Sequence, residues 1–250
     1  VVGHDHLGHG KTAKTPEDWG YFADGESPEI LIGDMNKLRT LSQEPDKPYF
    51  MLGHSMGSYL LRRYLSVYGG GLSGAVIMGT GANPDAVAKL GMAVCKAIAA
   101  FKGWKYRSPF MEKLFFSGDF QKFDMDGTHP ENSWLTKDTE IVRFYYSEPR
   151  CTFKFTLKAY YDFLKTVYYV NRKENVEKIP KDLPILMVAG DCDPVGEFGK
   201  AVKRVYEMYK AAGINDVTLK LYENDRHEIL NETDKERVFD DIFNWCESRQ

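Results

Sequence analysis

Short apolar runs alternate with amphipathic stretches over much of the chain. The apolar runs predict strands at residues 1–5, 48–53, 72–78, 183–189 and 216–222. Apolar residues at helical spacing predict helices at residues 27–41, 56–68, 198–212 and 234–247. Ser27 stands where an N-cap is expected before the first of these helices, with Pro28 in its first turn. Strands that alternate with helices predict a parallel, doubly wound α/β sheet.

The alternation stops after Gly81. From there to residue 170 the pattern predicts helices without strands, at residues 86–101, 108–116, 136–146 and 156–168. We therefore expect an α/β core of residues 1–82 and 171–250, with residues 83–170 inserted as a helical cap. About half of the aromatic residues lie between residues 104 and 169. They could line an apolar ligand cleft, although we expect most of them to fill the core of the cap.

The composition fits one globular unit of 250 residues. Its net charge of −3 comes from interspersed acids and bases, so nucleic acid is not expected as a partner. We find no transmembrane segment and no signal peptide, which predicts a cytoplasmic protein. Four scattered cysteines without C-x-x-C spacing predict reduced thiols. The chain opens on Val1-Val2 without an initiating Met, which suggests that a preceding segment is missing.

The turn after the strand at residues 48–53 carries the clearest chemical signal. It reads Gly53-His-Ser-Met-Gly57, placed between a predicted strand and a predicted helix. This context is typical of a nucleophile elbow, in which a strained turn presents a serine hydroxyl to substrate. The glycines leave room where a Cβ atom would collide. The alternative is that Ser55 is only a small residue in a crowded turn.

A serine nucleophile needs a histidine to take its proton and a carboxylate to orient that histidine. His227 follows the last predicted strand, and the loop after the strand before it carries Asp191 and Asp193. The order Ser, Asp, His suits this type of elbow. We favour Asp193 because Pro194 fixes the turn after it, while Asp191 stays an alternative. Asp225 is expected to be a turn residue.

An oxyanion formed on attack needs preorganised donors. The backbone N–H of Met56, immediately after the serine, is one candidate. A second donor normally comes from a loop after an earlier strand, and we expect it to be missing from this chain. His9-Gly10 follows the strand next to the elbow and is expected to be structural.

Two further patterns near the start resemble known sites without matching them. His4-x-His6-x-x-His9 resembles the zinc motif of metallo-β-lactamases, but Gly8 stands where that motif has aspartate. Gly10-Lys-Thr12 resembles the end of a P-loop, whose first glycine would fall at Asp5. We therefore expect neither a metal nor a cofactor.

Several motifs together resemble one family. They are Gly3-His-Asp-His-Leu-Gly-His-Gly-Lys-Thr12, Gly53-His-Ser-Met-Gly57, Asn132-Ser-Trp-Leu-Thr136, Gly190-Asp-Cys-Asp-Pro-Val-Gly196 and Arg226-His-Glu-Ile-Leu-Asn-Glu232. In this order they resemble the lysophospholipase and monoacylglycerol-lipase-like branch of the α/β-hydrolases, also described as serine-aminopeptidase-like. The resemblance covers essentially the whole chain. Thr12 departs from it mildly, since a serine is common there.

The resemblance implies an α/β-hydrolase fold with a helical cap over the site and a triad of Ser55, Asp193 and His227. It also implies that the missing oxyanion donor belongs to a strand-loop preceding the Gly3 motif. We expect His54 and Trp134, which lie in two of the motifs, to contact substrate.

The hypothesis from sequence is a serine carboxyl-ester hydrolase that acts on monoacylglycerols or lysophospholipids through an acyl-enzyme on Ser55. One alternative is an aminopeptidase with the same triad. Another is a non-catalytic or crippled scaffold that binds a lipid or a partner.

Overall fold

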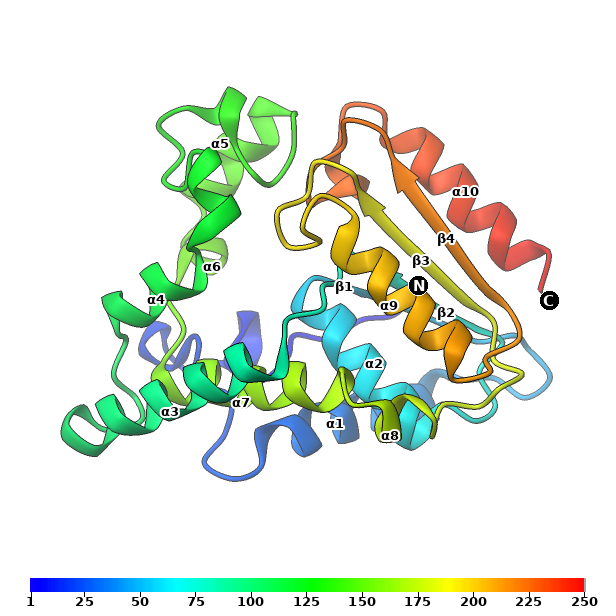
Figure 1. Cartoon of the computed structure of the whole chain (residues 1–250), viewed down its shortest axis with the longest axis horizontal. Helices are drawn as coiled ribbons and strands as arrows, with labels where there is room; N and C mark the ends of the chain where they lie inside the picture. The colour runs from blue at the N-terminus through cyan, green and yellow to red at the C-terminus, as the bar shows by residue number, and fades with distance from the viewer. Residues whose placement is uncertain (250) are drawn as a thin grey trace.

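A four-stranded parallel sheet forms the centre of the molecule (Figure 1). The computed structural model describes residues 1–249. Its strands pair in chain order and are β1 (Phe50–His54), β2 (Gly74–Met78), β3 (Ile185–Gly190) and β4 (Val217–Tyr222). Each of them falls within or next to a predicted strand. All four run the same way, so their carboxyl ends meet at one edge.

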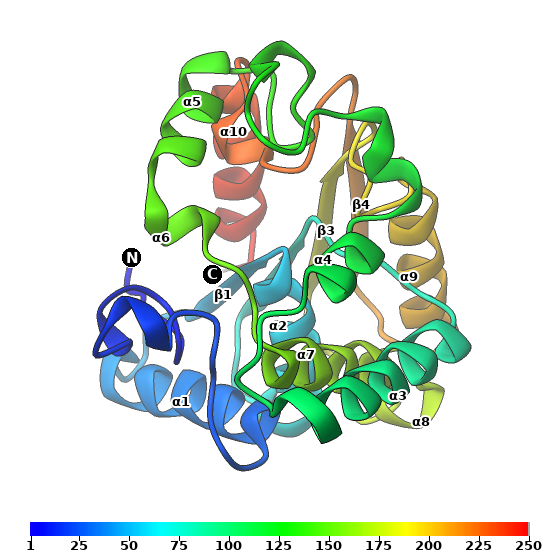
Figure 2. The ribbon, with the colours of Figure 1, turned by 90° about the vertical axis from the view of Figure 1, so that its left-hand side faces the viewer.

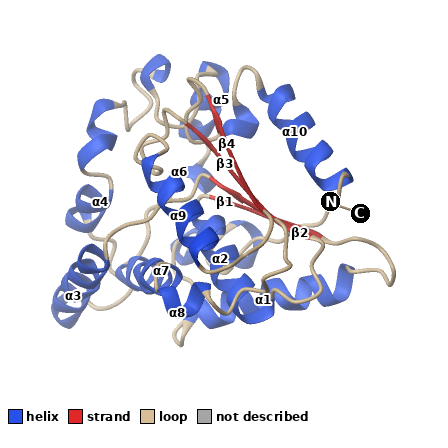
Figure 3. Ribbon diagram, turned by 45° about the vertical axis from the view of Figure 1, so that its right-hand side comes forward, coloured by secondary structure: helices blue, strands red, loops and turns tan. Residues whose placement is uncertain are grey.

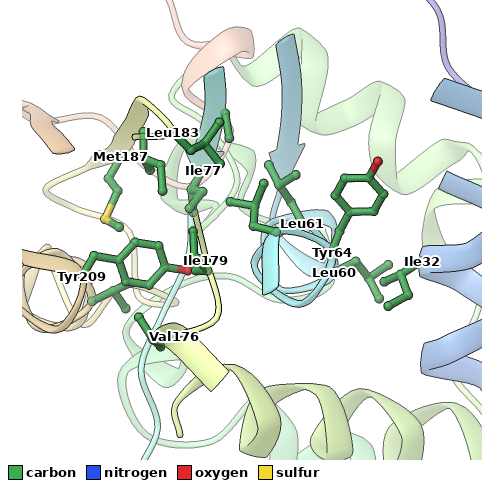
Figure 4. Close-up of a cluster of buried hydrophobic side chains, with 14 of the residues drawn as sticks. Ile32, Leu60, Leu61, Tyr64, Ile77, Val176, Ile179, Leu183, Met187 and Tyr209 are labelled. Atoms are coloured by element: carbon green, nitrogen blue, oxygen red, sulfur yellow. The ribbon is translucent and has the colours of Figure 1, made fainter. Parts of the chain in front are cut away.

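The two faces of the sheet bury alternate residues of the same strands. Ile77 and Met187 belong to the larger core cluster, which the helices α1 (Ser27–Ser42), α2 (Met56–Tyr68) and α9 (Lys200–Ala211) also line. Figure 4 shows this cluster, in which Leu61 of α2 lies toward the strands and Leu60 lies beside Ile32 of α1. Val76 and Val188 face the opposite way and pack on α10 (Lys235–Glu247). Helices thus cover both faces, as Figure 3 shows with α10 on one side of the strands and α2 and α9 on the other.

The long connection between β2 and β3 is helical. Its helices are α3 (Asp85–Lys102), α4 (Pro109–Phe115), α5 (Thr139–Ser147), α6 (Pro149–Thr152), α7 (Leu157–Val170) and α8 (Lys173–Val176). α7 packs between α2 and α3, and α3 and α4 lie in front of it in Figure 2. The arrowheads of β3 and β4 point toward the side where α4, α5 and α6 lie (Figure 1). The division into a core and a cap of residues 83–170 stays a prediction.

Two predicted details are wrong. Residues 1–5 form no strand among the described residues, and the side chains of Val1 and Val2 are exposed. An apolar pair becomes a strand only when a neighbour supplies ladder hydrogen bonds, and no described strand pairs with these residues. The N-cap of α1 is Glu26 rather than Ser27, because the Ser27 hydroxyl donates instead to the carbonyl of Ala23.

Candidate active site

Ser55 lies at the junction of β1 and α2 in a strained conformation. Its φ of 54° and ψ of −123° belong to a region that side-chain-bearing residues seldom occupy. The backbone around it is well anchored, since its N–H donates to the carbonyl of Met78 at 3.1 Å. Its own carbonyl accepts from the N–H of Ser58 at 2.8 Å, which closes the first turn of α2. The strain is therefore held in place by the strand on one side and the helix on the other.

His227 and Asp193 come from the loops after β4 and β3. The Nδ1–H of His227 donates to Oδ2 of Asp193 at 2.9 Å, and both side chains are buried. The other carboxylate oxygen of Asp193 accepts from the N–H of Val195 at 2.8 Å. With Nδ1 protonated, the second ring nitrogen of His227 carries a lone pair. That Nε2 atom is buried and has no hydrogen-bond partner among the described residues.

His54 joins the nucleophile's strand to the histidine loop. Its Nε2–H donates to the backbone carbonyl of His227 at 3.0 Å, and the two imidazoles lie 4.6 Å apart between ring centroids. Burial, and to a smaller extent the neighbouring His227, lower the pKa of His54 to about 4. The Nε2 atom of His54 is thus already bound within the protein, and a contact of His54 with substrate stays a prediction.

Gly79, at the end of β2, makes room for both rings. Its φ is +59°, and a Cβ atom built there would lie 3.1 Å from the ring atoms of His227 and of His54. The carboxyl ends of all four strands therefore contribute to one small region: Ser55 after β1, Gly79 after β2, Asp193 after β3 and His227 after β4.

Trp134 packs its ring against His227. The ring centroids are 5.0 Å apart with the planes inclined by 31°, and the N–H of His227 donates to the carbonyl of Trp134 at 3.3 Å. The ring centroid of Phe120 lies 5.3 Å from that of Trp134, and the ring centroid of Phe116 lies 5.3 Å from that of Phe120. A continuous row of aromatic rings thus runs from the histidine toward α4.

Of the other aromatics of the segment, Tyr160 and Phe163 are buried, whereas several, among them Phe110 and Phe144, are exposed. The expectation that most of them fill the core of the cap is therefore wrong.

The first turn of α2 offers a backbone donor. Met56 is the first residue of the helix, a position whose N–H has no intrahelical partner. The N–H of Met56 points out of the positive end of the helix dipole, and this end favours negative charge.

The two remaining aspartates of these loops have other partners. Asp191 accepts the N–H of Asn224 at 2.7 Å and so ties the loop after β3 to the loop after β4. Asp225, expected in a turn, is instead fully buried, and its Oδ1 lies 2.7 Å from Nζ of Lys137. Burial raises the pKa of Asp225 despite this lysine.

No role was predicted for Glu232, although the residue closes one of the motifs. Its carboxylate is fully buried and accepts backbone N–H groups from Arg226 at 2.8 Å and Lys137 at 3.0 Å. The one signal that could have suggested this role is an acidic residue within a segment that looks buried. Its hydrogen-bond partners lie up to 96 residues away in the chain.

The histidines near the start form a separate aromatic group. The rings of His4 and His6 meet edge to face at 4.7 Å, and His9 stacks on Phe22 at 5.7 Å. The Nδ1–H of His9 donates to the carbonyl of Leu7. His9 is thus packed into the fold, in agreement with a structural role.

Comparison with known proteins adds the family. A family model described as serine aminopeptidase, S33, matches residues 1–234. The chain belongs to the serine aminopeptidase S33 family.

Several other proteins resemble this S33 chain over most of its length. The monoacylglycerol lipase of Mycolicibacterium smegmatis is 26% identical over 251 residues, which cover 98% of this chain and 76% of that protein. The monoglyceride lipase of Mus musculus is 26% identical over 260 residues, covering 100% and 73%. The crystal structure of a carboxyl esterase from Bacillus coagulans, in complex with glycerol, superposes with a TM-score of 0.86 at 31% identity, covering 98% and 79%.

These findings confirm the predicted resemblance and the α/β-hydrolase fold. This S33 protein is an α/β serine hydrolase of the lipase and esterase type. None of the helices within residues 1–249 has the length and apolar composition that a membrane crossing requires.

Proposed function

We propose that the chain is a serine carboxyl-ester hydrolase that cleaves monoacylglycerols or lysophospholipids through an acyl-enzyme on Ser55. One observation carries the proposal: His227 donates to Asp193 through Nδ1 and keeps a buried, unpartnered Nε2 atom at the strand edge where the strained Ser55 lies. This is the protonation pattern that a general base requires.

The chemistry follows from these groups. Nε2 of His227 takes the proton of Ser55 as Oγ attacks the ester carbonyl, and Asp193 stabilises the imidazolium that forms. The N–H of Met56 donates to the oxyanion, a contribution worth about 3 kcal/mol per donor in the transition state. His227 then gives the proton to the leaving alcohol. A water that His227 deprotonates next attacks the acyl-enzyme, which releases the fatty acid and frees Ser55.

The apolar acyl chain would lie against the row of Trp134, Phe120 and Phe116. These residues belong to the segment 83–170, which we propose as a cap over the site. The row offers rings without charge beside the general base, which suits an acyl chain better than a peptide. The monoglyceride and monoacylglycerol lipases among the relatives support the same substrate class.

Two measurements test the proposal. Hydrolysis of a p-nitrophenyl acyl ester, a monoacylglycerol and a lysophospholipid should fall by roughly 10⁴-fold or more in Ser55→Ala. A fluorophosphonate probe should label the parent protein and not this variant. Ser117→Ala, which changes a serine after α4, is the control and should behave as the parent. Unchanged ester hydrolysis in Ser55→Ala, or a parent that cleaves aminoacyl amides and not esters, would contradict the proposal.

A further inference from the structure

Glu232 holds an unusual position for a carboxylate. It lies in the loop after the short helix η5 (Ile229–Asn231), and its side chain is fully buried. Burying a carboxylate is costly unless hydrogen bonds replace the lost water. Three donors do so here, and they come from two different segments of the chain.

One oxygen of Glu232 binds the loop of the general base. Oε1 accepts the backbone N–H of Arg226 at 2.8 Å, and Arg226 immediately precedes His227. No other side chain of the described residues accepts from this N–H. The carboxylate therefore fixes the peptide from which the His227 backbone continues.

The other oxygen binds the segment that carries Trp134. Oε2 accepts the hydroxyl of Thr136 at 3.1 Å and the N–H of Lys137 at 3.0 Å. The same two segments meet again through the backbone, where the N–H of His227 donates to Trp134 and the N–H of Glu228 donates to Leu135 at 2.7 Å.

The side chain of Arg226 reinforces this connection from the other direction. Its guanidinium donates to the carbonyls of Glu131, Ser133 and Thr136. The His227 loop and the Trp134 segment therefore form one unit, although about ninety residues separate them in sequence. Glu232 is the only carboxylate within residues 1–249 that accepts hydrogen bonds from both.

We infer that Glu232 is a positioning residue for His227: its buried carboxylate joins the peptide before the general base to the segment that places Trp134 against that base. This inference rests on the proposed function, since it assigns Glu232 to the reaction of Ser55. A shift of the imidazole by about 1 Å is enough to reduce a rate by about 100-fold. Because the carboxylate of Glu232 is fully buried and occupied by N–H and hydroxyl donors of the protein, we expect its effect to fall on kcat rather than on KM.

The test compares Glu232→Gln and Glu232→Ala with the parent and with Glu223→Gln, which changes an exposed carboxylate of the loop between β4 and η5. The glutamine keeps the size of the side chain and one acceptor oxygen. Its NH₂ group, however, faces the donors that bind the other carboxylate oxygen in the parent. We expect kcat for a p-nitrophenyl ester to fall about tenfold in Glu232→Gln and about 100-fold in Glu232→Ala, with KM within about twofold of the parent. Labelling by the fluorophosphonate probe should slow in parallel, because phosphonylation uses the same base.

Circular dichroism and thermal unfolding separate this effect from a loss of fold, and Glu232→Gln decides the matter where the alanine variant does not fold. A folded Glu232→Gln with the parent kcat, or one that changes KM alone, would overturn the inference. Glu223→Gln should match the parent in all measurements. A Ser55→Ala variant that stays active would instead overturn the proposed function, so the two failures are distinguishable.

Discussion

The imidazole of His54, which stays neutral next to the general base, makes the stability of the fold depend on pH. Burial, and then His227, lower the pKa of His54 from 6.5 to about 4 in the folded state. The unfolded chain therefore binds the proton more readily. The stabilising contribution is complete above pH 6.5 and is lost as the pH falls from 6.5 toward 4. At about pH 5 the loss amounts to about 2 kcal/mol relative to about pH 7.

His54→Gln should remove this dependence while keeping an N–H donor for the carbonyl of His227. The free energy of unfolding, measured in urea at about pH 7 and about pH 5, should differ between the two pH values by about 2 kcal/mol less than in the parent. His6, whose pKa burial and then His4 also lower to about 4, contributes equally to both proteins and cancels. His129→Gln, which changes an exposed histidine, is the control. An unchanged pH dependence in His54→Gln would refute the assignment.

Residues that act through local pattern were predictable, and residues that act through distant contacts were not. Ser55 could be predicted because the glycines, the strand and the helix around it are neighbours in sequence. The Asp193 and His227 loops follow strands whose apolar runs are visible. Glu232 and Lys137 act together only because the fold brings segments about ninety-five residues apart into contact. No periodicity in the chain marks such a pair.

At the scale of elements the same contrast applies. The apolar residues of a strand are visible in the sequence, whereas the neighbour with which it pairs is not. Apolar runs predicted β2, β3 and β4 directly. β2 and β3 are buried along their whole length, while the four central residues of β4 are only partly buried. The run at residues 1–5 also begins with two valines, but it has no described partner to pair with. The N-cap of α1 shifted by one residue for a similar reason, because the hydroxyl of Ser27 had an alternative acceptor in Ala23.

The junction of β1 and α2 depends on one of its two glycines. A Cβ atom at Gly53 would lie 2.4 Å from the carbonyl oxygen of Gly57, a backbone atom that cannot move without displacing the helix. A Cβ atom at Gly57 meets nothing within 4 Å. Gly53→Ala should therefore destabilise the fold by about 3 kcal/mol, as overpacking does. Gly57→Ala should be neutral or stabilising by up to about 1 kcal/mol, since alanine favours helix.

Urea unfolding of the two variants beside the parent measures both values. The pair is matched because the residues flank Ser55 symmetrically and the substitution is the same. Equal stabilities for the two variants would show that the helix can move away from the strand, and that Gly53 is not required for the close approach.

At the scale of the molecule, one buried arginine connects the sheet to the helical segment. Arg62 of α2 donates to the hydroxyl of Thr80 at 3.1 Å and to the carbonyl of Gly81 at 2.8 Å, just beyond β2. It also donates to the carbonyl of Val170 at 3.1 Å and to the side chain of Asn171 at 2.7 Å, where α7 ends. All four hydrogen-bond partners among the described residues are neutral oxygens. The two ends of the segment from residue 81 to residue 171 are thus held by one side chain.

Arg62→Met keeps much of the length of the side chain but leaves these oxygens buried without a donor. Each unsatisfied acceptor costs about 1–3 kcal/mol, part of which is recovered because a buried charge is removed, so we expect a net loss of about 3 kcal/mol. For a chain of this size that corresponds to a fall in Tm of roughly 10 °C. Arg63→Met, one residue along, breaks an ion pair with the half-exposed Glu29 and a contact with Tyr169, and should cost about 1 kcal/mol. Thermal unfolding of both variants decides the point: if Arg63→Met lowers Tm as much as Arg62→Met, the segment is held by the packing of α7 on α2 rather than by the arginine.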